Sequence, residues 1–204
     1  HIGGPNGPYR QTERREIYKE FAWQLVDLGK AFPCFCDAER LNRIRQEQIK
    51  NKQNPRYDGA CRNLDPDEGH RRAAAGEKFV IRFKMPKEGS VITTDLLRGS
   101  TITENSALDD SVLIKSDGLP TYHIAAMVDD HLMGISHVIR GSEWLPSLPL
   151  HVHIIRAFGW EEPLFVHLSV LLKPSGKGKM SKREAVEAIK DGHSIFVGDL
   201  QGLG

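Results

Sequence analysis

The strongest candidate for chemistry in this sequence is a basic loop near its carboxyl end. Residues 177–183 hold four cations, and Gly176 and Gly178 stand beside them. Glycine gives such a loop freedom to hinge, and lysine ammonium groups act as point charges. A loop of this composition can close over a polyphosphate and neutralise the charge that builds on a leaving group. A solvated basic turn is the competing interpretation for a generic loop of this kind.

Three cysteines form a second candidate, a metal site. Cys34 and Cys36 are separated by one residue, and Cys61 follows after 24 more. A Cys-x-Cys pair with a distant third thiolate can begin a tetrahedral zinc site. The competing interpretation is three reduced thiols that bind no metal.

Arg140 and Tyr122 form a third candidate, a binding site for a carboxylate. Arg140 ends the expected strand at residues 137–140, and open α/β sheets bind ligands at the carboxyl ends of their strands. A guanidinium can hold a carboxylate through two parallel hydrogen bonds. Tyr122 follows a Gly-Leu-Pro turn, so its hydroxyl could face the same pocket. A surface ion pair for Arg140 and a packed aromatic ring for Tyr122 are the alternatives.

The sequence predicts alternating helices and strands, and these elements must position the candidate residues. Thr12 is a candidate cap for a helix whose apolar stripe ends at Leu28, with Gly29 just beyond it. Residues 33–76 read as polar and irregular apart from one charged helix. The expected helices cover residues 40–52, 122–128, 146–158 and a stretch from 184, and the expected strands cover 79–84, 91–94, 111–115, 137–140 and 165–172. The last third therefore predicts β-α-β units, and the middle predicts a separate mixed insertion around Phe79, Ile81 and Phe83.

Composition excludes several classes of protein. The chain has 204 residues, 39% of them hydrophobic and 27% charged, which is typical of a globular domain. The charges nearly cancel at net +1, so bulk charge gives no argument for nucleic-acid binding. The apolar runs are too short for a membrane span. An odd number of cysteines argues against a disulfide framework and fits a reducing compartment.

Several long motifs, taken in order, resemble the glutamyl-tRNA synthetases, which are class I aminoacyl-tRNA synthetases. Lys179-Met180-Ser181-Lys182-Arg183 resembles their KMSKS signature. The run from Leu119 to Trp144 resembles their catalytic core. Further similar segments lie upstream, at residues 3–14, 55–62 and 80–86. The resemblance extends over nearly all of residues 3–183.

The resemblance implies an α/β fold, namely part of a class I synthetase Rossmann-like fold with a mixed α/β connective-peptide insertion. The implied domains are a catalytic segment at residues 1–32, an acceptor-binding insertion at 33–117, and the second half of the Rossmann-like domain at 118–204. We expect a monomer without membrane attachment, in a cytoplasm of bacterial type or in an organelle.

The implied reaction is the ATP-dependent ligation of L-glutamate to tRNA(Glu) through glutamyl-adenylate, with Mg²⁺ on the ATP phosphates. By the resemblance, Lys179 and Lys182 are catalytic, and Met180, Ser181 and Arg183 complete the ATP-binding loop. Tyr122 and Arg140 correspond to residues that contact the amino acid. The family often has Asn four residues after that Tyr, where this chain has Ala126, so one polar contact to the substrate is missing or replaced.

The resemblance also bears on the metal site. Some glutamyl-tRNA synthetases bind zinc through cysteines at this spacing and place His two residues after the last one, where this chain has Asn63. Asn63 is a poor ligand, so Tyr57 and His70 are the candidates for the fourth position beside Cys34, Cys36 and Cys61.

The first residues imitate the HIGH signature of the class. A true HIGH motif follows a strand and opens a helix, whereas Pro5 and Pro8 follow His1-Ile2-Gly3-Gly4 at once. We therefore expect this tetrapeptide to be a look-alike in a loop. The genuine HIGH half and the anticodon-binding domain are then expected to lie outside these 204 residues, and the isolated chain to have little activity.

Two alternatives remain beside a synthetase fragment. One is the paralogue that glutamylates queuosine in tRNA(Asp), whose insertion is shorter than this one. The other is a non-catalytic RNA-binding or zinc-binding module derived from the synthetase.

Overall fold

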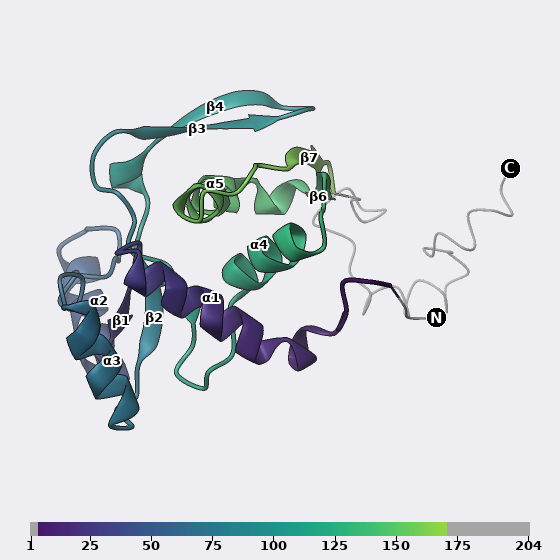
Figure 1. Ribbon diagram of the computed structural model, residues 1–204. Helices are drawn as coiled ribbons and strands as arrows, with labels where there is room; N and C mark the ends of the chain where they lie inside the picture. The colour runs from purple at the N-terminus through teal and green to yellow at the C-terminus, as the bar shows by residue number, and fades with distance from the viewer. Residues whose placement is uncertain (1–3, 171–204) are drawn as a thin grey trace, which may run out of the picture.

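Two β-sheets organise residues 4–170, the part of the chain that the computed structural model describes (Figure 1). The first sheet is antiparallel with the order β1-β2-β5, and its strands are Ala31–Cys34, Val80–Phe83 and Val112–Ile114. The second sheet has the order β4-β3-β7-β6, and its strands are Gly99–Glu104, Ser90–Asp95, Leu164–Leu168 and His137–Gly141.

Parallel pairing aligns the carboxyl ends of β6 and β7 in the second sheet. β6 and β7 run parallel, with His137 opposite Leu164 and Gly141 opposite Leu168. The connection between them contains the 3₁₀ helix Ser142–Ser147 and helix α5, Leu148–Ala157, which makes the β-α-β unit that the sequence predicts. β3 joins the other side of β7 in parallel at Asp95 and Phe165. The last residues of β6 and β7 therefore lie side by side, whereas β3 ends level with Phe165, near the start of β7.

Four further helices complete the arrangement. They are α1, Arg15–Asp27; α2, Ala38–Lys50; α3, Pro66–Ala74; and α4, Tyr122–Leu132. In Figure 1, α1 crosses the molecule from the first sheet to α4, while α2 and α3 flank the first sheet. Among the described residues, every helix is too short or too polar to span a membrane.

One continuous core joins both sheets. Tyr18 and Leu25 of α1, Ile81 of β2, Met127 of α4 and Ile154 of α5 are all buried in it. Because α1 contributes to the packing of both the first sheet and α4, it fixes the two halves against each other.

The predicted elements around the core are largely confirmed. Ile81 and Phe83 are buried, but in the core that they share with α1, α4 and α5, and Phe79 packs against that same core. Gly29 and Gly159 follow α1 and α5 with φ near +70°, the left-handed conformation that ends a helix. Among the β-strands and α-helices of residues 4–170, three had not been predicted from the sequence: β1, α3 and β4.

The start of α1 differs from the prediction. Thr12 does not cap it; residues Gln11–Glu13 form a 3₁₀ turn and the helix begins at Arg15. The reason is Arg14, which is only 2% exposed and donates from Nε to Asp129 Oδ1 of α4 at 2.7 Å. The Tyr18 hydroxyl donates to the same carboxylate at 2.8 Å. This ion pair between the buried Arg14 and the partly buried Asp129 holds the start of the helix, where no side chain caps it.

The predicted domain division stays a prediction. β1 runs across the boundary proposed between residues 32 and 33. β3 belongs to the proposed insertion but pairs with β7 of the following segment. The insertion is therefore attached to the rest by sheet pairing as well as by its two chain connections.

Helix α3 gives a testable prediction about packing. An added Cβ at Gly69 would lie 2.5 Å from Cγ of Pro33 in β1. In a free helix, Gly→Ala stabilises by about 1 kcal/mol, but overpacking a contact of this kind costs about 1–3 kcal/mol. We expect Gly69→Ala to lower the free energy of unfolding in urea titrations. The exposed Arg71→Ala on the same helix should change it by less than about 0.5 kcal/mol. A more stable Gly69→Ala protein would contradict the packing described.

Candidate functional site

Arg140 occupies the second-last position of β6, at the edge where the parallel strands end. Its Nε donates to Nε2 of His167 in β7 at 2.9 Å. Its Nη1 donates to the Tyr122 hydroxyl at 3.4 Å. The structure thus brings together the two residues that the sequence predicts to bind the amino acid.

The Arg140 guanidinium has spare donor capacity. Its Nη2 nitrogen is buried and has no hydrogen-bond partner among the described residues. Unpaired buried donors are rare in proteins, and at the carboxyl end of a parallel strand a bound ligand is one explanation for such a group. Nε donates to an imidazole nitrogen and Nη1 donates to a hydroxyl. Neither acceptor is a carboxylate, so neither supplies a negative charge to the guanidinium. A ligand carboxylate would supply both the missing acceptor and the missing charge.

Tyr122 is the first residue of α4, and its ring packs against another aromatic ring. Its ring lies 4.1 Å from the Trp144 ring, measured between centroids. The side chain is 39% exposed, so the hydroxyl can meet a ligand. Ala126, one turn later on α4, packs against the core and offers no polar group in place of the expected Asn.

The charge of Arg140 affects the groups around it. Burial, together with the nearby positive charge of Arg140, lowers the pKa of His151 to about 2 and also lowers the pKa of His123. His123 Nδ1 and His151 Nε2 lie 3.0 Å apart. Burial raises the pKa of Asp130 to about 6, against the opposing effect of Arg140. These histidines therefore stay neutral and add no competing positive charge near neutral pH.

Two residues behind Arg140 had not been predicted from the sequence. His167 is fully buried in β7, and its Nδ1 lies 2.7 Å from Oδ2 of Asp95 at the end of β3. The sequence signal for His167 was the alternation of buried and exposed positions in β7. Phe165 and His167 share the inward face of this strand, where a polar side chain needs a buried partner. That partner comes from a strand some 70 residues away in sequence, which no local pattern identifies.

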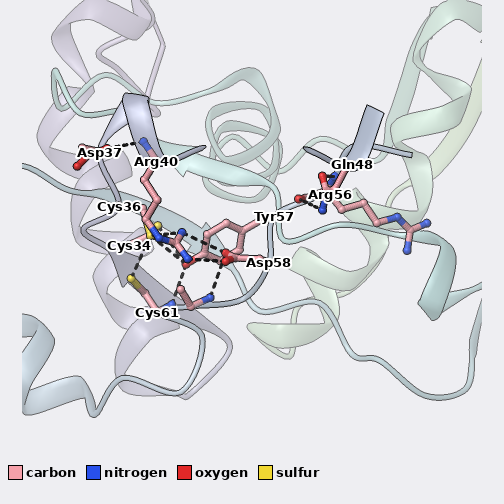
Figure 2. Close-up of polar contacts among 10 residues, drawn as sticks. Cys34, Cys36, Asp37, Arg40, Gln48, Arg56, Tyr57, Asp58 and Cys61 are labelled. Atoms are coloured by element: carbon pink, nitrogen blue, oxygen red, sulfur yellow. Dashed lines mark hydrogen bonds and ion pairs between the residues drawn. The ribbon is translucent and has the colours of Figure 1, made fainter. Parts of the chain in front are cut away.

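The cysteine candidate also assembles as predicted. The Sγ atoms of Cys34, Cys36 and Cys61 all lie within 4.8 Å of one another (Figure 2). Sγ of Cys34 donates to the Tyr57 hydroxyl at 3.3 Å, and Sγ of Cys36 lies 3.7 Å from the same oxygen. Tyr57 is therefore at the cluster.

His70, the other candidate for the fourth position, lies elsewhere. Its Nε2 contacts Oδ1 of Asp27 at 2.7 Å, and its ring stacks on Trp23 at 4.3 Å. Of the two candidates that the sequence left open, only Tyr57 reaches the sulfur atoms.

Neighbouring groups order the cysteine cluster. Arg40 of α2 donates to Sγ of Cys36 at 3.2 Å and forms an ion pair with Asp58 at 2.5 Å, as Figure 2 shows. The Tyr57 hydroxyl accepts from the backbone N–H of Cys61 at 2.8 Å. Burial raises the pKa of the Cys36 thiol to about 11 in the absence of a metal. A metal bound here would have to displace that proton.

The predicted phosphate loop, Lys179, Met180, Ser181, Lys182 and Arg183, lies outside the described residues, as do His1, Ile2 and Gly3 of the HIGH look-alike.

The chain is similar to known proteins over most of its length. Residues 2–199 match the family described as "tRNA synthetases class I (E and Q), catalytic domain". The glutamate–tRNA ligase of Ectopseudomonas mendocina is 54% identical over 183 residues, which are 90% of this chain and 37% of that protein. The glutamate–tRNA ligase of Fusobacterium nucleatum is 51% identical over 90% of this chain and 36% of that protein. This chain therefore spans little more than a third of these curated relatives.

A solved structure shares both fold and sequence with the chain. The crystal structure of a glutamate tRNA ligase from Elizabethkingia meningosepticum, in complex with its amino acid, aligns with a TM-score of 0.81 and 43% identity. The alignment covers 95% of this chain and 39% of that one.

Proposed function

This chain belongs to the class I tRNA synthetase family for glutamate and glutamine, within its catalytic domain, and on that premise we propose that it serves glutamate–tRNA ligation. Its fold is accordingly the Rossmann-like α/β fold of that family. The proposed reaction activates L-glutamate with ATP and transfers the glutamyl group to tRNA(Glu). The proposal includes a cytoplasmic location, where free thiols such as those at Cys34, Cys36 and Cys61 persist.

The convergence of Arg140 and Tyr122 at the strand ends carries the proposal. A positive side chain with a buried, unpaired Nη2 stands where open α/β sheets bind ligands. Glutamate offers carboxylates, and a carboxylate matches the fork of a guanidinium. We propose that Arg140 holds one of them and that Tyr122 contacts the same substrate.

The lysine loop supplies the other half of the proposal from the sequence. Lys179 and Lys182 would neutralise the pyrophosphate as the bond to the α-phosphate breaks, with Met180, Ser181 and Arg183 in the same ATP-binding loop. Mg²⁺ is the usual companion of ATP phosphates in this class of reaction.

A structural zinc ion fits the residues of the cysteine cluster. Tetrahedral zinc with Zn–S bonds of about 2.3 Å requires sulfur atoms about 3.8 Å apart. Sγ of Cys36 and Sγ of Cys61 are 3.7 Å apart. The three thiolates and the Tyr57 oxygen would hold the ion and link the end of β1 to the segment that contains Cys61. Such a site stabilises the fold and takes no part in the reaction.

Arg140 variants test the amino-acid pocket. Truncating one partner of a buried charge pair costs about 2–5 kcal/mol, so Arg140→Ala should raise the KM for glutamate by about 30-fold or more. The KM for ATP should stay nearly unchanged. Arg140→Lys should rescue only in part, because an ammonium cannot make the two-pronged contact. ATP–pyrophosphate exchange with tRNA present measures both constants; an unchanged glutamate KM in Arg140→Ala refutes the pocket.

Lys182 should behave in the opposite way. Its charge matters most while the pyrophosphate leaves, so Lys182→Ala should lower kcat more than it raises the KM for ATP. Single-turnover measurement of glutamyl-adenylate formation separates the two effects. A variant with normal kcat and only a raised KM for ATP would assign Lys182 to ground-state binding instead.

Metal analysis tests the cysteine cluster. The chain purified without chelators should contain about one zinc ion, and Cys36→Ser or Cys61→Ser should lose it. Tyr57→Phe should weaken retention during dialysis against a chelator. His70→Ala is the matched control and should retain zinc like the parent. A metal-free parent, or loss of zinc in His70→Ala with retention in Tyr57→Phe, would contradict the ligand set.

A further inference from the structure

A chain of buried contacts lies behind Arg140 and connects three strands. Asp95 ends β3, His167 lies in β7 and Arg140 lies near the end of β6. The contacts measure 2.7 Å from Asp95 Oδ2 to His167 Nδ1 and 2.9 Å from His167 Nε2 to Arg140 Nε. Asp95 is 3% exposed and His167 is fully buried, so solvent does not compete for these bonds.

The donor and acceptor atoms of Arg140, His167 and Asp95 determine the direction of each hydrogen bond in this series of contacts. Arginine nitrogens only donate, so Nε2 of His167 must be the acceptor. A neutral imidazole that accepts at Nε2 carries its proton on Nδ1, and Nδ1 then donates to Asp95. The opposite tautomer would place two N–H groups face to face at 2.9 Å. The Asp95 carboxylate therefore selects the tautomer that can hold Arg140.

Asp95 is itself held rigidly. Its Oδ1 accepts from the backbone N–H groups of Leu97 and Arg98, both at 2.9 Å. Its Oδ2 also accepts from the backbone N–H of His167 at 2.9 Å. The carboxylate cannot swing toward Arg140 without losing these bonds.

The arrangement leaves Nη2 of the guanidinium without a partner among the described residues. Engaging Nε fixes the rotation of the planar group, so the contact with His167 sets the positions of Nη1 and Nη2. A carboxylate bonded side-on to Arg140 would take both Nε and Nη2 and neutralise the charge, whereas a neutral imidazole takes Nε alone and leaves the charge in place. Asp95 bonds the opposite side of the His167 ring and is therefore separated from Arg140 by that ring.

We infer that Asp95 and His167 are positioning residues that hold Arg140 ready to bind the substrate carboxylate. This inference rests on the proposed function, since it presumes that Arg140 contacts glutamate. Neither residue touches the substrate, so both act through the orientation of Arg140.

Two substitutions at His167 separate positioning from simple core packing. The amide of Gln reaches the position of Nε2, so His167→Gln keeps an acceptor for Arg140. The amide of Asn reaches the position of Nδ1, so His167→Asn keeps a donor to Asp95 and loses Arg140. Each variant loses one of the two hydrogen bonds of the imidazole, but only His167→Asn loses the bond to the Arg140 guanidinium.

The experiment measures the KM values for glutamate and ATP by ATP–pyrophosphate exchange. It uses the gene product that carries this segment, with tRNA present, below the melting midpoint of each variant. We expect His167→Asn to raise the glutamate KM about tenfold or more, and His167→Gln to stay within about threefold of the parent. The KM for ATP should change by less than about twofold in both. Asp95→Asn, which permits the wrong tautomer, should resemble His167→Asn.

His153→Asn is the matched control. His153 lies in α5, is half-buried and bonds Asn105 at 2.8 Å, without a hydrogen bond to Arg140. Its glutamate KM should match the parent. Equal KM values in His167→Asn and His167→Gln, while Arg140→Ala still raises KM, would overturn the positioning role alone. An unchanged KM in Arg140→Ala would overturn the proposed pocket and the inference with it.

Discussion

The buried carboxylate of Asp95 is the constraint on which the site depends. Burial alone would raise its pKa, but hydrogen bonds from His167 and from backbone N–H groups outweigh that effect and hold the pKa below its usual value. The carboxylate therefore stays ionised where solvent cannot reach it. It ties the β3–β4 hairpin to β7 and fixes the ring that holds Arg140. A single ionised group thus joins β3 to β7 and also fixes the orientation of Arg140 through His167.

A second constraint joins helices α1 and α4, away from Arg140. Arg14 and Tyr18 of α1 share the Asp129 carboxylate of α4, which begins with Tyr122. The cysteine cluster stands at the far end of β1, and its proposed zinc ion would fix that lobe. Because α1 packs against both regions, the two constraints bear on one rigid core rather than on separate parts.

Local sequence patterns predicted much of this fold and part of the site. The strand that ends at Arg140 and the helix at Tyr122 followed from alternation and turn residues, and the cysteine spacing pointed to a cluster that the structure assembles. Helix α3 went unpredicted although Asp65 caps it and Pro66 opens it, which are usable local signals. The start of α1 and the partner of His167 could not be predicted, because both depend on a carboxylate from a distant segment.

A structure of the gene product with glutamate bound tests the central claim most directly. The account predicts a glutamate carboxylate within hydrogen-bonding distance of Nη1 or Nη2 of Arg140, while Nε still donates to His167 and Nδ1 of His167 still faces Asp95. A glutamate held entirely by other residues, with Arg140 turned away from it or paired directly with a protein carboxylate, would contradict it.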